Sequence, residues 1–235
     1  VPVIYDGNDK DAAEVIAAKA KELGSPAYKV VQAGAKVLGN NKDGIDFSLE
    51  DDYYGDTRFH IPFIAWYQVM NASLALTTME VLKDRIPVTM EQLQAGIANT
   101  RWQGRMETIL PGVIVDGAHN EDGVRRFVET AERFQKEYPL TLLFSAVNDK
   151  DYQDMIHTIC SRIKFRKVVT TEVGGYREVP SAELAEIFCK EGCKDIGNSD
   201  NIEEAFHMAH EAKGEDGMLF CVGSLYLVGE IKAYL

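Results

Sequence analysis

Hydrophobic residues in the first hundred positions switch between short strand-like runs and a helical period. Apolar residues three or four positions apart between Ala12 and Leu23 predict an amphipathic helix that Gly24 ends. The Asn-Asn-Lys-Asp-Gly run that ends at Gly44 predicts a hairpin turn. In chain order the pattern predicts a strand at 3–5, a helix at 9–23, a strand at 28–31, a hairpin over 36–49, a loop at 50–60, a helix at 63–82 and a short helix after Pro87 that Thr89 and Gln92 cap.

From about residue 101 the pattern becomes a regular alternation of strands and helices. It predicts strands at 113–115, 140–147, 168–171, 194–196 and 218–222, and helices near 122–136, 151–162, 181–191, 200–212 and 224–235. Ser181 and Asp200 are the expected N-caps of two of these helices. Such alternation predicts an α/β fold with a doubly wound, mostly parallel sheet. We place a domain boundary near 98–103, which gives parts 1–100 and 101–235.

Composition and charge narrow the class of protein. The 235 residues include 25 Lys and Arg against 37 Asp and Glu, a formal net charge of −12. Coating nucleic acid requires clustered basic residues, so this balance argues against it. No apolar run approaches the roughly 18–20 residues of a membrane helix, and four cysteines are too few for a disulfide framework in a chain of this length. We therefore expect a cytoplasmic protein that binds neither nucleic acid nor membranes.

The strongest candidate site follows the apolar strand at 113–115. The chain continues Asp116-Gly117-Ala118-His119-Asn120 directly before a predicted helix. Ligands of open α/β sheets bind at the carboxyl ends of strands, where helix N-termini favour anions. Asp116 is suited to a ribose hydroxyl or a hydrated metal, and His119 to a phosphate or a carboxylate. The simpler alternative makes Asp116 a helix cap and His119 a surface turn residue, but the grouping of these residues favours function.

Two further strand ends and a preceding segment carry candidate residues. Lys150, within Asn-Asp-Lys-Asp after the strand at 140–147, offers a point charge to an anion. The equally supported alternative is a turn in which Asp149 or Asp151 caps the next helix. Ser224 has the position of a helix N-cap, although capping does not explain the Gly223 before it. Arg105 follows Gly104 near the expected boundary and could contact phosphates. His207 and His210 have no converging ligand residues, so we predict no metal site. The sequence contains no Gly-x-x-x-x-Gly-Lys-Ser/Thr motif.

Taken together and in this order, four segments resemble the folylpolyglutamate synthases of the Mur ligase superfamily, which are often also dihydrofolate synthases. The segments are Gly-Arg-Met-Glu from 104, Asp-Gly-Ala-His-Asn from 116, Asn-Asp-Lys-Asp from 148 and Gly-Ser-Leu-Tyr-Leu-Val-Gly-Glu from 223. The resemblance implies a three-domain ligase in which ATP, with Mg²⁺, phosphorylates a carboxylate of folate or pteroate, and glutamate displaces the phosphate. It also implies that the C-terminal domain is Rossmann-like, and that the full-length enzyme is a monomer.

The resemblance also assigns roles to residues of this chain. It places Asn71 near the adenine, Arg105 near the phosphates and Asp116 at the ribose of ATP. It places His119, as the catalytic residue, close to the reacting phosphate and glutamate. Lys150 and Ser224 are expected to hold the carboxylate of the incoming glutamate. At the position before Gln68, where the family usually has histidine, this chain has tyrosine.

The family's P-loop, magnesium ligands and carbamylated lysine would precede Val1, so the resemblance implies a C-terminal portion of a longer chain. Residues 1–100 would be the tail of a central P-loop ATPase domain, and 101–235 the whole C-terminal domain. We then expect this fragment to be inactive alone. The alternative is a non-catalytic doubly wound module that binds a nucleotide or a partner. It explains the missing P-loop without truncation, but leaves part of 1–100 without a covering partner.

Overall fold

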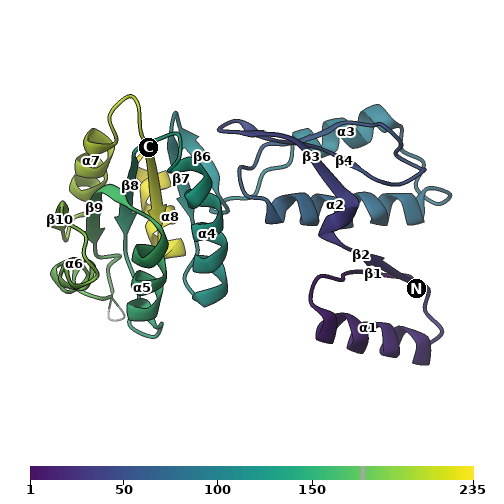
Figure 1. Cartoon of the computed structure of the whole chain (residues 1–235), viewed down its shortest axis with the longest axis horizontal. Helices are drawn as coiled ribbons and strands as arrows, with labels where there is room; N and C mark the ends of the chain where they lie inside the picture. Colours follow the sequence, from purple (N-terminus) through teal and green to yellow (C-terminus); the bar gives the residue numbers. More distant parts are fainter. Residues whose placement is uncertain (176–177) are drawn as a thin grey trace. The chain divides into compact units, whose positions relative to one another are not determined.

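The computed structural model describes residues 1–175 and 178–235 and divides into two compact units, Val1–Arg101 and Trp102–Leu235 (Figure 1). Unit 1 contains β1 (Val3–Asp6), α1 (Lys10–Glu22), β2 (Ala27–Val30), a 3₁₀ turn (Gln32–Gly34), β3 (Ala35–Asn41), β4 (Gly44–Leu49), β5 (Phe59–Ile61), α2 (Tyr67–Leu82) and α3 (Met90–Ala98). The assignment of unit 1 to the tail of an ATPase domain stays a prediction.

Unit 1 contains two small sheets. Strands β1 and β2 pair in parallel, and β3, β4 and β5 form an antiparallel sheet. The buried side chains Phe47, Phe59 and Leu76 belong to one hydrophobic cluster that joins this second sheet to α2. Thr89 and Gln92 form the predicted capping box at the start of α3, which is confirmed.

Two predictions for unit 1 were wrong. Strand β5 lies partly within the predicted loop at 50–60, because Phe59 and Ile61 are buried on either side of the half-buried His60 and pair with β4. Helix α2 begins at Tyr67 and not at residue 63. Residues 63–65 are all buried but form no helical turn. The hydrogen bonds at the start of the helix run from the Gln68 and Val69 N–H groups to the Ala65 and Trp66 carbonyls.

Unit 2 is built on a six-stranded sheet in the order β10-β9-β8-β11-β7-β6. Its elements are β6 (Glu107–Leu110), β7 (Val113–Asp116), α4 (Glu121–Phe134), β8 (Leu140–Phe144), α5 (Tyr152–Arg162), β9 (Phe165–Thr171), α6 (Ser181–Lys190), β10 (Ile196–Ser199), α7 (Ile202–Lys213), β11 (Met218–Val222) and α8 (Leu225–Tyr234). All neighbouring strands pair in parallel except β6 and β7. The predicted α/β fold with a mostly parallel sheet is confirmed.

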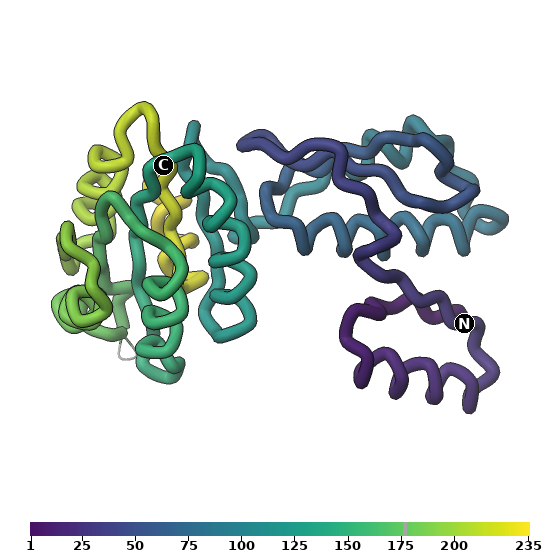
Figure 2. Tube along the Cα trace, viewed as in Figure 1, coloured from purple at the N-terminus to yellow at the C-terminus, as the bar shows by residue number. Residues whose placement is uncertain are grey.

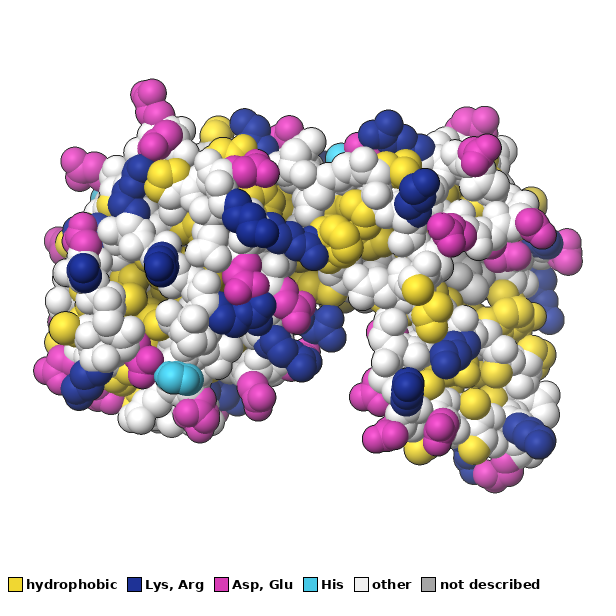
Figure 3. Space-filling view, viewed as in Figure 1, with side chains coloured by type: hydrophobic (Ala, Val, Ile, Leu, Met, Phe, Trp, Pro, Cys, Tyr) yellow, Lys and Arg dark blue, Asp and Glu magenta, His cyan; other side chains and the backbone are white. Residues whose placement is uncertain are grey.

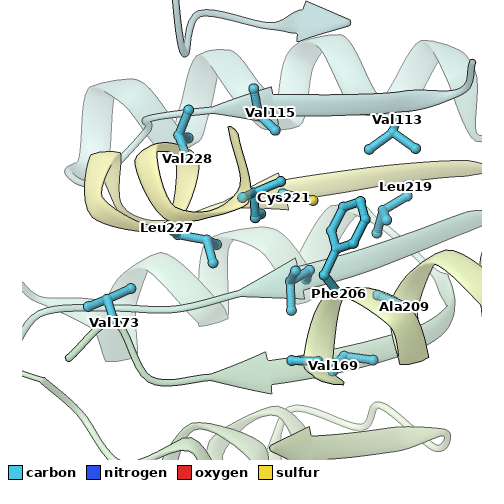
Figure 4. Close-up of a cluster of buried hydrophobic side chains, with 13 residues drawn as sticks. Val113, Val115, Val169, Val173, Phe206, Ala209, Leu219, Cys221, Leu227 and Val228 are labelled. Atoms are coloured by element: carbon cyan, nitrogen blue, oxygen red, sulfur yellow. The ribbon is translucent and has the colours of Figure 1, made fainter. Parts of the chain in front are cut away.

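Alternate residues of each strand pack against helices on opposite faces of this sheet. On one face, Phe220 of β11 stacks edge-on against Phe127 of α4. On the other, Leu219 and Cys221 of β11 pack in a buried cluster with residues of α7 and α8, including Phe206 (Figure 4). Strands β8 and β11 are buried at every position. This two-sided burial explains why their sequences are continuous apolar runs.

The chain path brings three strand ends together. After β7 the chain crosses to β8 and continues outward to β9 and β10, and α7 then returns it to β11 between β8 and β7 (Figure 2). The carboxyl ends of β7, β11 and β8 are therefore neighbours at the point where the strand order reverses, which is the usual ligand position in such sheets.

The predicted N-caps at Ser181 and Asp200 were both wrong. Ser181 is the first residue of α6, and Asn201 caps α7 by accepting from the Glu204 N–H. The Ser181 hydroxyl instead donates to the Asp200 carboxylate at 2.5 Å. The two side chains therefore tie the starts of α6 and α7 together. The predicted strand at 194–196 is displaced to β10.

Candidate functional site

The segments that begin at Gly104 and Asp116 fold onto one another. The Gly117 N–H donates to the Gly104 carbonyl at 2.8 Å, and the Met106 N–H donates to the Asp116 carboxylate at 2.8 Å. Glu107 accepts from the Gly104 N–H and from Lys232 of α8 at 2.6 Å. The two motifs, ten or so residues apart, are thus parts of one hydrogen-bonded structure at the end of β7.

Asp116 is the central acceptor of this structure. Only 4% of the residue is exposed, and its two carboxylate oxygens accept from the backbone N–H groups of Met106 and Ala118. Burial raises the pKa of Asp116 to about 6, against the lowering effect of the two N–H donors and of the nearby Arg105 charge. Asp116 does not cap α4; that function belongs to Asn120, which accepts from the Gly123 N–H.

Met106 has a strained backbone next to Asp116. It is the one non-glycine residue in the described part of the chain with a positive φ, at 46°, and its side chain is buried. A bulky side chain in this region costs on the order of 1–3 kcal/mol. The hydrogen bond to Asp116 and the burial of the side chain offset this strain, and together they fix the backbone directly after Arg105.

Arg105 lies against the Gly117 turn. Its Nη1 atom would be 3.1 Å from a Cβ built at Gly117, and within residues 1–175 and 178–235 its guanidinium has no hydrogen-bond or ion-pair partner. The side chain is half-buried. Its donors therefore remain available for an anionic ligand beside Asp116.

A side chain at Gly117 would have to displace the side chain of Leu225. A Cβ there would lie 2.2 Å from Cδ2 and 2.7 Å from Cγ of Leu225. We expect Gly117→Ala to reduce the free energy of unfolding by about 1–3 kcal/mol through this overpacking. Because Leu225 is half-exposed and can be shortened, Leu225→Ala in the same chain should recover most of the loss. Urea unfolding of the two single variants and the double variant tests this, and strictly additive losses would contradict the contact.

His119 is oriented by the same turn. Its Nδ1 lies 2.7 Å from the Gly117 carbonyl oxygen. Because a carbonyl only accepts, Nδ1 carries the hydrogen in this contact and the neutral ring has an unprotonated Nε2. The ring is half-buried. His119 can therefore present a proton acceptor to a neighbouring molecule.

A cavity of about 240 Å³ brings His119 and Lys150 together. It lies between the residues that follow β7 and those that follow β8, and its lining is His119, Asn120, Glu121, Asp149, Lys150, Asp151, Asp154, Met155 and Thr158. Lys150 is half-buried, with its amino group 3.9 Å from the Asp149 carboxylate. Two of the predicted site residues thus line one cavity. Among its described lining residues, Lys150 is the one Lys or Arg, and the other charged residues are Asp and Glu.

Ser224 and Asn71 are placed differently. Ser224 is 2% exposed and caps α8 by accepting from the Tyr226 N–H at 3.1 Å, and it is not among the lining residues of the cavity. Asn71 is an exposed residue of α2, in unit 1, and donates to the Gln68 side chain at 2.8 Å. Their assignments to glutamate and adenine stay predictions.

Sequence reasoning missed two features of this site. One is strand β6 with Met106 before it, which holds Arg105. The other is the group of acidic residues in the cavity, among them Glu121 and Asp154. Asp154 lies in the first turn of α5, where the helical period could have placed it on the side of Lys150. No local pattern indicated the left-handed backbone of Met106.

Residues 1–175 and 178–235 were compared with the side-chain groups that hold metal ions and with the helices that cross membranes. Within them, no group of three or more His, Cys, Asp or Glu side chains is arranged to hold a metal ion. No step below is derived through a metal ion. None of the helices in the described ranges is long and apolar enough to cross a membrane. On the face in Figure 3, basic side chains of unit 2 are interspersed with acidic ones.

Comparisons with known proteins identify the family of this chain. Residues 104–225 match the family described as "Mur ligase, glutamate ligase domain". The chain is 27% identical over 248 residues to the dihydrofolate synthase/folylpolyglutamate synthase of Bacillus subtilis. This alignment covers all of this chain and 55% of that protein. The structure of a folylpolyglutamate synthase from Thermotoga maritima matches with a TM-score of 0.79 at 23% identity. The match covers 100% of this chain and 54% of the Thermotoga maritima chain.

A second similar structure contains nucleotides. The Mycobacterium tuberculosis folylpolyglutamate synthase, complexed with ADP and AMPPCP, has a TM-score of 0.74 at 21% identity, and the match covers 96% of this chain and 53% of that one. At these identities the structural matches establish the fold alone. The chain spans about half the length of each of the relatives compared.

Proposed function

The chain belongs to the Mur ligase family, and we propose that it is part of an ATP-dependent ligase that joins glutamate to a folate. The B. subtilis relative is described as a dihydrofolate synthase/folylpolyglutamate synthase, which supports folate and glutamate as substrates. The observation that carries the proposal is the joining of the Gly104 and Asp116 segments, which presents Arg105, Asp116 and His119 at one sheet edge next to the Lys150 cavity.

The proposed reaction requires activation of a carboxylate. A free carboxylate is a poor electrophile, so ATP phosphorylates it to an acyl phosphate and leaves as ADP. The glutamate amine then attacks the acyl carbon, the carbon–oxygen bond to phosphate breaks, and an amide and phosphate are formed. An acyl phosphate hydrolyses in water, so a site that orients the amine and excludes water favours amide formation.

Each residue of the site has a proposed role. Ionised Asp116 accepts from a ribose hydroxyl, and the guanidinium of Arg105 binds phosphate oxygens. Nε2 of His119 takes the proton that the amine loses as it attacks. Lys150, which lines the cavity, pairs with a carboxylate of the incoming glutamate. Asn71 and Ser224 are proposed to contact adenine and glutamate as the resemblance implies.

Binding of ADP to the 235-residue chain tests the nucleotide part of the proposal. We expect ADP to shift the amide resonances of Met106, Gly117 and Ala118, and Arg105→Ala to weaken binding on the order of 10- to 100-fold through loss of charge-assisted hydrogen bonds. The matched control is Arg166→Ala, because Arg166 pairs with Asp216 and lies at the amino-terminal end of β9, whereas the candidate site follows the carboxyl ends of the strands. Equal weakening by both substitutions, or shifts confined to other strand ends, would refute the nucleotide site.

We also propose that the 235-residue chain alone does not form the acyl phosphate. Its sequence lacks the Gly-x-x-x-x-Gly-Lys-Ser/Thr motif that holds the β- and γ-phosphates in P-loop enzymes. Incubation with ATP, a reduced folate and L-glutamate is therefore expected to yield no amide product. Glutamate ligation by the isolated chain would contradict this proposal.

A further inference from the structure

Two cysteines far apart in the sequence are in contact on unit 2. Cys160 lies near the end of α5, and Cys193 follows the end of α6. Their sulfur atoms are 3.6 Å apart although the residues are 33 positions apart. Both residues are partly exposed, so a small molecule in solution can reach the pair.

A second contact holds the same two segments together. His157, one turn before Cys160 on α5, lies with Nδ1 2.9 Å from the carboxylate of Glu191, two residues before Cys193. The backbone N–H of Cys193 also donates to the Phe188 carbonyl at the end of α6. The approach of the two thiols is therefore fixed by neighbouring contacts and does not depend on one side-chain rotamer alone.

We propose that Cys160 and Cys193 form a modification site, which a two-electron oxidant such as hydrogen peroxide converts to a disulfide. An S–S bond is about 2.05 Å long, so the sulfurs must approach by roughly 1.5 Å. Glu191 and Gly192, which precede Cys193, are exposed, so a movement of this size at Cys193 does not have to displace buried side chains at these two positions. In a reducing compartment such a disulfide is transient, which is typical of redox-sensitive thiols.

The chemistry balances with one peroxide per thiol pair. The Cys193 thiolate attacks one oxygen of the peroxide and the O–O bond breaks. The released hydroxide takes up the proton that the Cys193 thiol lost on ionisation and becomes water. The Cys160 sulfur then attacks the sulfur of the Cys193 sulfenic acid, the S–O bond breaks, and a second water leaves with the Cys160 proton. Two electrons pass from the thiols to the peroxide.

The order of attack follows from the environment of the pair. A hydrogen bond from the Cys160 thiol holds the pKa of Cys193 below its ordinary value, whereas this bond, burial and the Glu191 carboxylate raise that of Cys160. Cys193 is therefore the thiol that reacts first. The two other cysteines serve as internal comparisons, since Cys189 is exposed and Cys221 is fully buried.

Peptide mass spectrometry after peroxide treatment of the reduced chain tests the site. We expect a Cys160–Cys193 cross-link in the wild-type chain and a rise in the thermal midpoint, because the bond closes a loop that contains β9 and α6. In Cys160→Ser the reaction should stop at a Cys193 sulfenic acid, which dimedone traps. Cys189→Ser, on the exposed surface of α6, should cross-link like the wild type.

Each outcome decides the proposal. Free thiols at both positions after oxidation, or a cross-link through Cys189, would overturn it. Thermal unfolding of all variants in the reduced state shows whether a substitution damages the fold. If Cys160→Ser is damaged, the cross-linking results for the wild type and Cys189→Ser decide the proposal without it. The proposal does not depend on the ligase function, since it needs neither ATP nor folate.

Discussion

Replacing Gly223 by alanine is expected to destabilise unit 2 by about 4 kcal/mol or more. Gly223 has a φ of 112°, a backbone region that L-residues rarely adopt. A Cβ there would lie 2.0 Å from the Ser145 carbonyl oxygen and 2.9 Å from Phe144. Neither neighbour can move away, because both are fully buried at the end of the central strand β8. Losses of this size are exceptional for a single substitution.

Gly229→Ala is the matched control for this prediction. Gly229 lies within α8, and a Cβ built there has no heavy atom within 4 Å. Alanine at this position should leave the fold intact and stabilise the helix by roughly 0.5–1 kcal/mol. Urea unfolding of both variants gives the comparison. A Gly223→Ala chain that unfolds at the wild-type denaturant concentration would show that the β11–α8 turn is not as tight as described.

The second large effect is a pH dependence that Asp116 produces. Its pKa in the folded chain is about 6, above its ordinary value of 3.8, because burial disfavours the ionised form. The folded state therefore binds a proton that the unfolded state has lost between these two values. The resulting stability is fully present below pH 3.8 and is lost as the pH rises through about 6. The difference corresponds to roughly 3 kcal/mol.

Comparison of the wild type with Asp116→Asn isolates this effect. Exposed carboxyl groups such as Asp122 and Asp216 have lowered pKa values and act in the opposite direction, but they are common to both chains. Urea unfolding between pH 4 and pH 7.5 should show the wild type losing up to about 3 kcal/mol relative to Asp116→Asn as the pH rises. A difference that stays constant across this range would mean that Asp116 is not buried as a carboxylate.

Much of unit 2 was predictable because its strands and helices have a single clear period. The boundaries of β11 at Met218 and Val222 agree with the prediction. The buried residues of α4, such as Val124 and Phe127, recur at the helical period. Strand β6 was missed because it is a half-exposed edge strand with an irregular register at Thr108. Its pairing depends on β7 and has no strong local signal.

The candidate site was predictable only in part for the same reason. Strand-end position places His119 and Lys150 on one sheet edge, and the structure brings them to one cavity. The junction of Arg105 with the Gly117 turn depends on hydrogen bonds between segments that are separate in sequence. The left-handed backbone of Met106 is held by its hydrogen bond to Asp116, which is distant in sequence, so local propensity gives no indication of it.

The ligase proposal is tested by measuring glutamate-dependent ADP formation in an enzyme that contains this chain together with a P-loop domain, supplied with ATP and a reduced folate. The account predicts one ADP and one phosphate for each new amide, and a KM for glutamate that Lys150→Ala raises on the order of 10- to 100-fold. Lys190→Ala, an exposed residue at the end of α6, should leave that KM unchanged. Nucleotide binding without glutamate-dependent turnover, or a glutamate KM unaffected by Lys150→Ala, would contradict the account and favour a non-catalytic nucleotide-binding module.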